Sequence, residues 1–459
     1  MTDRMDAGTS KWVTLIINII AQFLLPYSFS ALNVALPSIG KEFAMDAILL
    51  GWAATSFLLV AAAFLVPFGR LADIYGQKRI FKYGIFLNVV SSLLCAVANS
   101  GYLLIFFRVL QGIGAAMVVG VGIAILTSVF PPKERGKALG IAIGSVYLGL
   151  TLGPFIGGVL TEHFGWRSIF YLGAILGVVA IALIVWKLKG EWAEAKGEKF
   201  DLIGSVILCL SLIVMMYGFS VLPTVLGIVL FVLGVLGMVA FVWWEKRVAS
   251  PVFNIGLFRK NTVFVFSNVA ALINYSAVFA ISFLLSLYLQ YSRGFSPQIA
   301  GLILVAQPAI MTIFAPIAGR LSDRVNPRKV AAFGMAVSCV SIALLAFLDE
   351  KTAMGFIVGI LAFGGLGMGF FSSPNMNAIV GSVEKKFFGV AAGTVSTMRS
   401  CGMMLSMGIV MILFALYIGR TEITPEYYPA FLSSMKVGFS IFAALCFVGV
   451  FAQLADRKG

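Results

Sequence analysis

Fourteen long apolar runs dominate this sequence, and each is long enough to cross a lipid bilayer. A spanning helix needs about 20 mostly apolar residues, because the hydrocarbon core is about 30 Å thick. Backbone polar groups in lipid must pair within the chain, and the runs lack the alternation of a β-barrel, so the sequence predicts helices. The predicted spans are 12–37, 47–69, 80–98, 102–130, 137–160, 166–187, 200–221, 223–244, 262–290, 298–319, 330–348, 352–380, 387–417 and 431–454.

The composition agrees with an all-α integral membrane protein and excludes several other classes. Apolar residues form 60% of the 459-residue chain and charged residues only 11%, whereas soluble domains have about 25% charged residues. The net charge of +14 would indicate a nucleic-acid partner only on a soluble basic domain, and none is predicted. One histidine and five scattered cysteines predict no metal site, cofactor or disulfide framework. An enzyme would need clustered His, Asp or Glu at the membrane face, which the sequence lacks.

The basic residues orient the predicted helices. With the N-terminus in the cytoplasm, 25 of the 33 Lys and Arg residues fall in cytoplasmic loops, five in outer loops and three within spans. By the positive-inside rule, we expect an even number of spans in the cell membrane, with both termini cytoplasmic. We also expect the basic loops to contact anionic membrane lipid. The three basic residues within spans are Arg108, Arg399 and Lys436.

A short motif occurs twice, 250 residues apart. Gly-Arg-Leu-x-Asp begins at Gly69 and again at Gly319, in both cases between the second and third helix of a six-helix set. The repeat predicts an N-terminal six-helix bundle at 12–187 and a C-terminal one at 262–455, with two inserted helices at 200–245. Repeats of this kind are typical of transporters, which bind substrate near the midplane between them. Two bundles in one chain favour a monomer, whereas a channel would need pore-lining rings in a symmetric oligomer.

The order of the motifs resembles the major facilitator superfamily, and more closely its fourteen-span drug:proton antiporter branch. Gly69–Arg79 is similar to the family's loop motif, and Arg108–Gly112 to its motif in the fourth span. Gly149–Gly158 is similar to the fifth-span motif of exporters, and Asn33–Pro37 ends the first span as in fourteen-span members. The resemblance implies two pseudo-symmetric bundles and a secondary active transporter. It also implies export of small amphiphilic, drug-like compounds by alternating access with proton antiport.

The resemblance also implies two closing elements. A cytoplasmic latch would join the bundles when the site faces outward; an ordinary basic loop with turn glycines is the alternative. An outer seal of small residues in the fifth span would pack against the opposite bundle; helix packing without a directional role is the alternative. The latch residues are Gly69, Arg70, Asp73, Gly76, Arg79, Gly319, Arg320 and Asp323, and the seal residues are Gly149, Gly153, Pro154, Gly157 and Gly158.

Charged residues within spans are the candidates for substrate or proton linkage. An arginine at bilayer depth is costly, so it faces the protein interior or a wet cavity. Arg108 and Gln111 lie on one face of their helix. Helix–helix hydrogen bonding is the alternative for Arg108 and Arg399, and Lys436 could extend to the membrane surface. The predicted linkage residues are Arg108, Gln111, Arg399, Asn33, Ser28 and Lys436.

The predicted membrane interior lacks a carboxylate. Exporters of cationic drugs in this branch usually carry an aspartate about five residues before the Asn-Val-Ala-Leu-Pro run, and Ser28 stands there in this sequence. A carboxylate would both carry a proton and bind a cation. Its absence favours a neutral, anionic or lipid-like substrate. The alternative function is therefore transport of a lipid, lysolipid or organic anion by the same fold without proton coupling.

Overall fold

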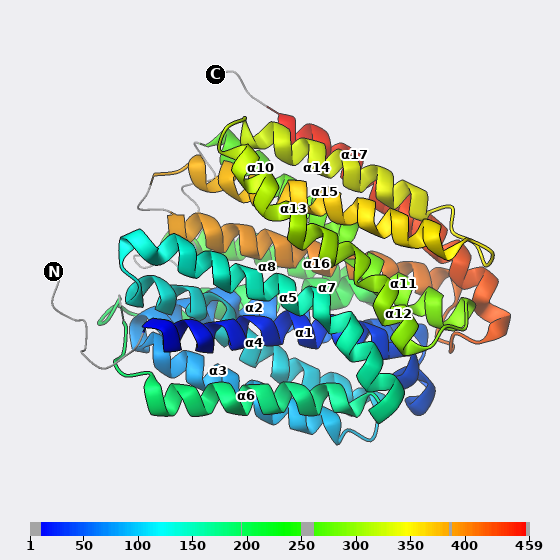
Figure 1. The fold of residues 1–459 in the computed structure, drawn as a ribbon, viewed down its shortest axis with the longest axis horizontal. Helices are drawn as coiled ribbons and strands as arrows, with labels where there is room; N and C mark the ends of the chain where they lie inside the picture. Colours follow the sequence, from blue (N-terminus) through cyan, green and yellow to red (C-terminus); the bar gives the residue numbers. More distant parts are fainter. Residues whose placement is uncertain (1–10, 194, 249–260, 385–387, 456–459) are drawn as a thin grey trace.

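The computed structural model describes residues 11–193, 195–248, 261–384 and 388–455. Fourteen helical segments in this part of the chain are long and apolar enough to cross a membrane, which confirms the predicted number of spans. Figure 1 shows the long helices running roughly along one axis. The elements are α1 (Lys11–Phe43), α2 (Ala47–Tyr75), α3 (Gln77–Ala96), α4 (Gly101–Val129), α5 (Pro132–Phe164), α6 (Arg167–Lys187), α7 (Leu202–Ser220), α8 (Val225–Glu245), α10 (Thr262–Val278), α11 (Ala280–Leu287), a π-helical turn (Tyr288–Ser292), α12 (Pro297–Leu304), α13 (Ala306–Ser322), α14 (Pro327–Leu345), α15 (Met354–Gly381), α16 (Phe388–Tyr417), a 3-10 turn (Pro425–Tyr427) and α17 (Tyr428–Leu454).

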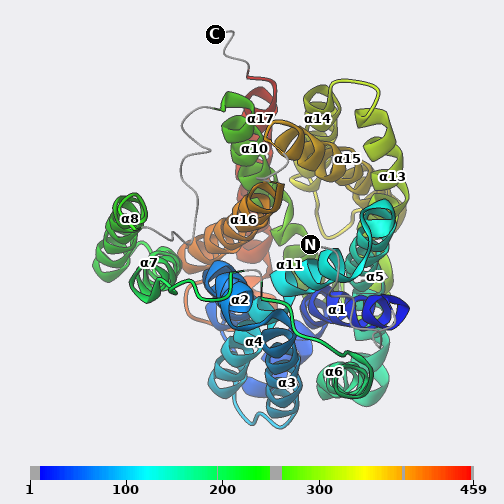
Figure 2. The same ribbon diagram turned by 90° about the vertical axis from the view of Figure 1, so that its left-hand side faces the viewer.

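The helices form two bundles with an inserted pair. Helices α1 to α6, here called the N half, pack mainly as α1 on α5, α3 on α4 and α2 on α4. Helices α10 to α17, the C half, pack mainly as α14 on α15, α13 on α15, α14 on α17 and α10 on α16. Figure 2 shows the two halves one above the other, with α7 and α8 to one side. Substrate contacts are therefore to be sought where the N half faces the C half.

Two of the predicted spans are interrupted. The first break, at Phe279, separates α10 from α11, because the hydroxyl of Ser406 accepts the N–H of Ala280 at 3.0 Å. A side chain that enters the hydrogen-bond ladder in this way interrupts or bends a helix. The second break, at Val305, separates α12 from α13. Pro308 follows three residues later and has no N–H for the carbonyl four residues before it.

The inserted pair covers one seam between the halves. Helix α7 packs on both α2 and α16, whereas α8 packs mainly on α7. The Sγ of Cys209 lies 3.2 Å from the carbonyl of Ala63 in α2. A Cβ on Gly408 of α16 would lie 2.1 Å from the Phe219 ring of α7, so this glycine provides the space for the ring. At the other seam α5 meets α12 and α13 directly (Figure 2).

The two ends of the helices differ in their loops. The basic end, where α2 passes into α3 and where the linker 188–201 connects α6 to α7, is on the left in Figure 1 and faces the viewer in Figure 2. Arg70 and Arg79 flank the turn between α2 and α3. The opposite end carries Glu42, which accepts hydrogen bonds from both Trp166 and Arg167. These two names are used below for the ends of the molecule.

Candidate substrate site

The structure brings three of the predicted linkage residues together inside the N half. Arg108 is fully buried in α4. Its Nη1 donates to Oε1 of Gln111 at 2.5 Å and to the hydroxyl of Ser28 in α1 at 3.2 Å. The Nε2 of Gln111 donates to the hydroxyl of Ser92 in α3 at 2.8 Å. One hydrogen-bonded cluster therefore joins α1, α3 and α4 around the arginine.

An aromatic ring faces this arginine. The guanidinium carbon lies 4.4 Å from the centroid of the Phe57 ring in α2, which is a cation–π contact. Gly112 allows this approach, because a Cβ there would lie 2.5 Å from the backbone carbonyl of Phe57. Within the described residues, Nε and Nη2 of Arg108 are buried without a hydrogen-bond partner, and no carboxylate pairs with the guanidinium. The cluster therefore contains a positively charged side chain whose Nε and Nη2 remain able to donate hydrogen bonds.

A second cationic and aromatic group lies in the C half. The guanidinium carbon of Arg399 in α16 is 5.1 Å from the centroid of the Tyr275 ring in α10. The ring of Phe29 in α1 also stacks on the ring of Phe279, at the break between α10 and α11, with 4.7 Å between the ring centroids. Aromatic surface therefore comes from both halves, as a planar apolar ligand would require.

Two further predicted linkage residues lie outside these groups. Asn33 is buried in α1, its carbonyl accepts a hydrogen bond from Ser286 at 2.6 Å, and its side-chain amide has no partner among the described residues. Lys436 is exposed on α17. This position agrees with the alternative that the chain of Lys436 extends to the membrane surface, and its role in substrate or proton linkage stays a prediction.

Contacts between the halves are concentrated in the middle and at the opposite end. The hydrogen bonds between described residues of the two halves include Gln298 N–H to Glu162 (3.0 Å) and Gln290 to the carbonyl of Val34 (2.9 Å). Others join Ser286 to Asn33, Thr151 to Thr312, His163 to Gln298, Tyr291 to Pro37, and Ala47 to Thr421. The structure is therefore closed at the opposite end.

The fifth-span glycines contribute to this closure differently from the prediction. A Cβ on Gly149, Gly153 or Gly157 would clash with α1 of the same half, so the expected contact of this stripe with the opposite bundle is wrong. The glycines at intervals of four share one face, and that face meets α1. The next face of α5 meets the C half, where a Cβ on Gly158 would lie 2.5 Å from the carbonyl of Pro297 and one on Gly301 would lie 2.2 Å from the carbonyl of Pro154.

The predicted latch residues fall into two groups. Those of the first motif copy contact the N half and the linker, and those of the second copy contact the C half. Arg70 pairs with Glu198 and Arg79 with Glu191, both in the linker, and the Asp73 carboxylate accepts from Gln77 at 3.2 Å. In the second copy, Asn377 donates to Asp323 at 3.4 Å, a Cβ on Gly319 would lie 2.7 Å from the Ser373 hydroxyl, and Arg320 is exposed. Gly69 has open space around it. That these residues join the two halves in a state open at the opposite end stays a prediction.

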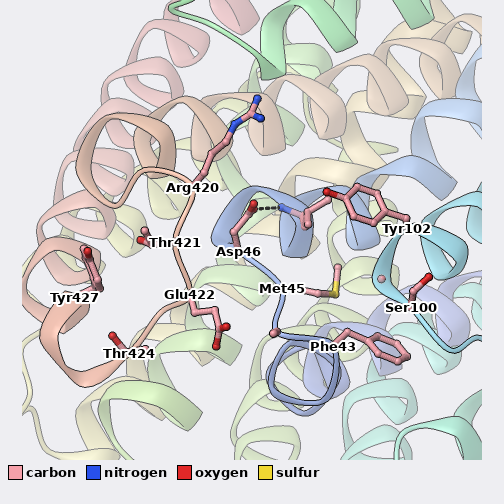
Figure 3. A pocket seen from close by; sticks show the side chains of 13 residues that line it. Phe43, Met45, Asp46, Ser100, Tyr102, Arg420, Thr421, Glu422, Thr424 and Tyr427 are labelled. Atoms are coloured by element: carbon pink, nitrogen blue, oxygen red, sulfur yellow. Dashed lines mark hydrogen bonds between the residues drawn. The ribbon is translucent and has the colours of Figure 1, made fainter.

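A cavity of about 740 Å³ lies at the opposite end between the halves. Figure 3 shows Phe43, Asp46 and Tyr102 from the N half and Arg420 and Glu422 from the C half around it. The carboxylate of Asp46 caps α2 by accepting the N–H of Leu49 at 2.7 Å, so it serves the helix end. The cavity is open to the surface and lies outside the clusters around the two arginines.

Comparison with known proteins identifies the family. A family model described as Major Facilitator Superfamily matches residues 19–258 and 268–458. The chain belongs to the major facilitator superfamily. Its members are transporters and not enzymes, so this chain is a multi-pass membrane transporter.

Individual members of the superfamily match most of the chain. The riboflavin transporter RibZ of Clostridioides difficile is 30% identical over 445 residues, which cover 96% of each protein. The multidrug resistance protein Stp of Mycobacterium tuberculosis is 28% identical and covers 90% of this chain and 77% of its own length. The crystal structure of a peptide transporter, POT, superposes with a TM-score of 0.70 at 15% identity, over 95% of this chain and 93% of that one; this likeness concerns the fold alone.

Sequence reasoning found Arg108, Gln111 and Ser28 but missed two of their partners. Ser92 and Phe57 sit in apolar runs without any distinguishing pattern. A signal for Phe57 does exist, since Gly112 marks a close approach of another helix to α4. The sequence alone does not say which helix that is.

Proposed function

We propose that this transporter exports small amphiphilic compounds with planar aromatic rings, neutral or anionic, in exchange for protons. The observation that carries the proposal is the buried guanidinium of Arg108, which has unused donors and no carboxylate partner among the described residues. A buried cation of this kind binds a carbonyl, phenolate or carboxylate oxygen of a ligand through charge-assisted hydrogen bonds.

The aromatic residues support a planar ligand. Phe29 and Phe279 stack across the halves, and Tyr275 lies against Arg399. The relative RibZ is a riboflavin transporter and Stp is a multidrug resistance protein. Riboflavin is a planar tricycle with several acceptor oxygens, and many drugs share this chemistry. We infer that the two arginines contact such oxygens while the rings of both halves cover the apolar faces.

The proposed direction of transport is argued from the charge of the two ends of the molecule. We infer that the basic end faces the cytoplasm of the cell membrane, by the positive-inside rule. Substrate would then enter from the cytoplasm in the state described, which is closed at the opposite end. Rocking of the halves would close the basic end and release the substrate outside. The latch residues and the α5 contacts at Pro154 and Gly158 would stabilise the two closed ends in turn.

Transport into inside-out membrane vesicles tests the proposal. Vesicles with the full-length protein are given riboflavin or the cation ethidium, with an acidic or a neutral interior. We expect riboflavin to accumulate only with the acidic interior, and ethidium to accumulate at least tenfold less. Vesicles with the Arg108→Gln variant serve as the matched control. Equal accumulation of riboflavin by the variant, or a preference for ethidium, contradicts the proposed substrate class.

One alternative has a specific observation in its favour. No carboxylate pairs with Arg108 in the described part of the chain, and a carboxylate is the usual proton carrier. In this alternative the protein moves an organic anion, lipid or lysolipid without proton coupling. Accumulation that is the same with and without the pH gradient would favour it over proton antiport.

A further inference from the structure

The linker between α6 and α7 lies across the loop that joins α2 to α3. It runs over the basic end of the N half from α6 to α7, as Figure 2 shows. Two backbone hydrogen bonds attach it there: the N–H of Gln77 donates to the carbonyl of Trp192 at 2.7 Å, and the N–H of Ala195 donates to the carbonyl of Asp73 at 2.9 Å. The Trp192 side chain also packs against the core of the N half. The linker is thus docked as a built part of this end and is more than a solvated connector.

Glu191 of the linker occupies the N-terminus of α3. Its Oε1 accepts the N–H of Lys78 at 2.8 Å and that of Arg79 at 3.4 Å, and its Oε2 lies 3.5 Å from Nε of Arg79. A carboxylate is favoured at a helix N-terminus. Gly76 provides the space, because its φ is +120° and a Cβ would lie 2.5 Å from Cδ of Glu191. Gly76 of the loop motif thus leaves the space that the contact with the linker requires.

Glu198 binds the other arginine of the motif. Its Oε2 pairs with Nη2 of Arg70, which is only 22% exposed, at the end of α2. Helix α2 is also the N-half helix that packs on α16 of the C half. Arg70 therefore stands on the helix that must move relative to the C half when the basic end closes. Its ion-pair partner comes from the linker.

The C-half copy of the motif has a different environment. Asn377 of α15 donates to Ser322 at 2.6 Å and to Asp323 at 3.4 Å, so these contacts come from the same half. The linker contacts that we find among the described residues concern the N-half copy. Among the residues that the structure describes, the two copies of the motif therefore have different partners.

We propose that Glu191 and Glu198 are positioning residues that hold Arg70 and Arg79 away from the C half and so favour the state open at the basic end. For the basic end to close, the two arginines must exchange the linker carboxylates for partners in the C half. This inference rests on the alternating access proposed above. Loss of the carboxylates removes one side of that competition and shifts the equilibrium toward closure of the basic end.

Distance measurements between the halves test this directly. Spin labels are placed at Lys137 of the N half and Val325 of the C half, both exposed at the basic end. The full chain carries them in lipid nanodiscs, with its five native cysteines replaced by alanine. We expect two populations of molecules, one with a long and one with a short distance between the labels. The long-distance population should dominate in the parent protein. An exposed ion pair contributes little, so Glu198→Gln should raise the ratio of short to long by about two- to fivefold.

Three further variants separate positioning from a general structural effect. Glu191→Gln combined with Glu198→Gln should shift the ratio further, and Glu198→Asp should restore the parent distribution. Glu134→Gln is the matched control, since Glu134 pairs with Lys11 at the same end of the same half, and it should change nothing. Because fewer molecules present the site to the basic end, the apparent substrate affinity measured there should fall in proportion to the remaining fraction of the long-distance state.

The possible outcomes distinguish this inference from the proposed function. The positioning role is overturned by an unchanged distance distribution in the double variant, by a larger long-distance population, or by an equal shift in Glu134→Gln. Thermal unfolding of each variant is measured in parallel, and a lower stability with unchanged distances assigns the two glutamates a purely structural role. The distances require no substrate. A shift without riboflavin transport therefore rejects only the proposed substrate, and transport without a shift rejects only the positioning role.

Discussion

Replacing Arg108 by glutamine separates a transport role of this side chain from a structural one. Two hydrogen bonds from a charged donor contribute about 1.5–3 kcal/mol each, and the contact with Phe57 about 2 kcal/mol. Against them stands the burial of an ion without a counter-charge, which costs several kcal/mol. The two contributions nearly cancel. We therefore expect Arg108→Gln to change the free energy of unfolding by less than about 2 kcal/mol.

Transport should respond much more strongly than stability. A charge-assisted hydrogen bond to the substrate contributes about 1.5–3 kcal/mol, which corresponds to a loss of about 10- to 150-fold in transport efficiency. The assay compares initial riboflavin uptake in inside-out vesicles with thermal unfolding of the purified protein. Ser92→Ala is the control, because it removes one neutral contact of about 0.6 kcal/mol from the same cluster. Parental transport by Arg108→Gln, or a stability loss above about 3 kcal/mol with transport intact, would refute the reasoning.

Three other predictions concern glycine contacts and the missing carboxylate. Gly158→Leu places a Cβ 2.5 Å from a carbonyl of α12 and should slow uptake at least tenfold, whereas Gly144→Leu on the same helix has open space and should not; equal rates would contradict the closure. Ser28→Asp puts a carboxylate beside Arg108 and should reduce riboflavin uptake while ethidium uptake rises and requires the pH gradient; unchanged selectivity counts against the cationic site. Gly408→Leu should lower the unfolding temperature by displacing α7, and adding Phe219→Ala should restore part of it; no recovery would argue against this contact.

The helices could be predicted because their signal is local. An apolar run of about 20 residues must pair its own backbone in lipid, so each run identifies a helix without knowledge of its neighbours. The interruption at Phe279 could not be predicted, since the Ser406 hydroxyl that accepts the Ala280 N–H comes from 126 positions away. The interruption near Val305 carried a local signal, the proline at position 308, which a count of apolar residues ignores.

The site was predictable in part for the same reason. Arg108 and Gln111 are three residues apart on one helix, so their contact follows from helix geometry. The spacing of Gly149, Gly153 and Gly157 likewise defines one face of α5. It does not say which helix that face meets, and the partner is α1 of the same half. Partner choice depends on the packing of whole helices, which a single sequence does not encode locally.

The asymmetry between the halves follows from where the insertion enters the chain. The inserted pair needs a connection from α6 to α7, and α7 lies against α2 and α16. That connection must cross the basic end of the N half, which brings Glu191 and Glu198 to one copy of the repeated motif. The same insertion covers the seam between α2 and α16 and leaves the seam between α5 and α13 uncovered (Figure 2). Within the described residues the linker 188–201 contacts the N-half copy of the motif, so we expect the two bundles to respond differently although they are built from one repeat.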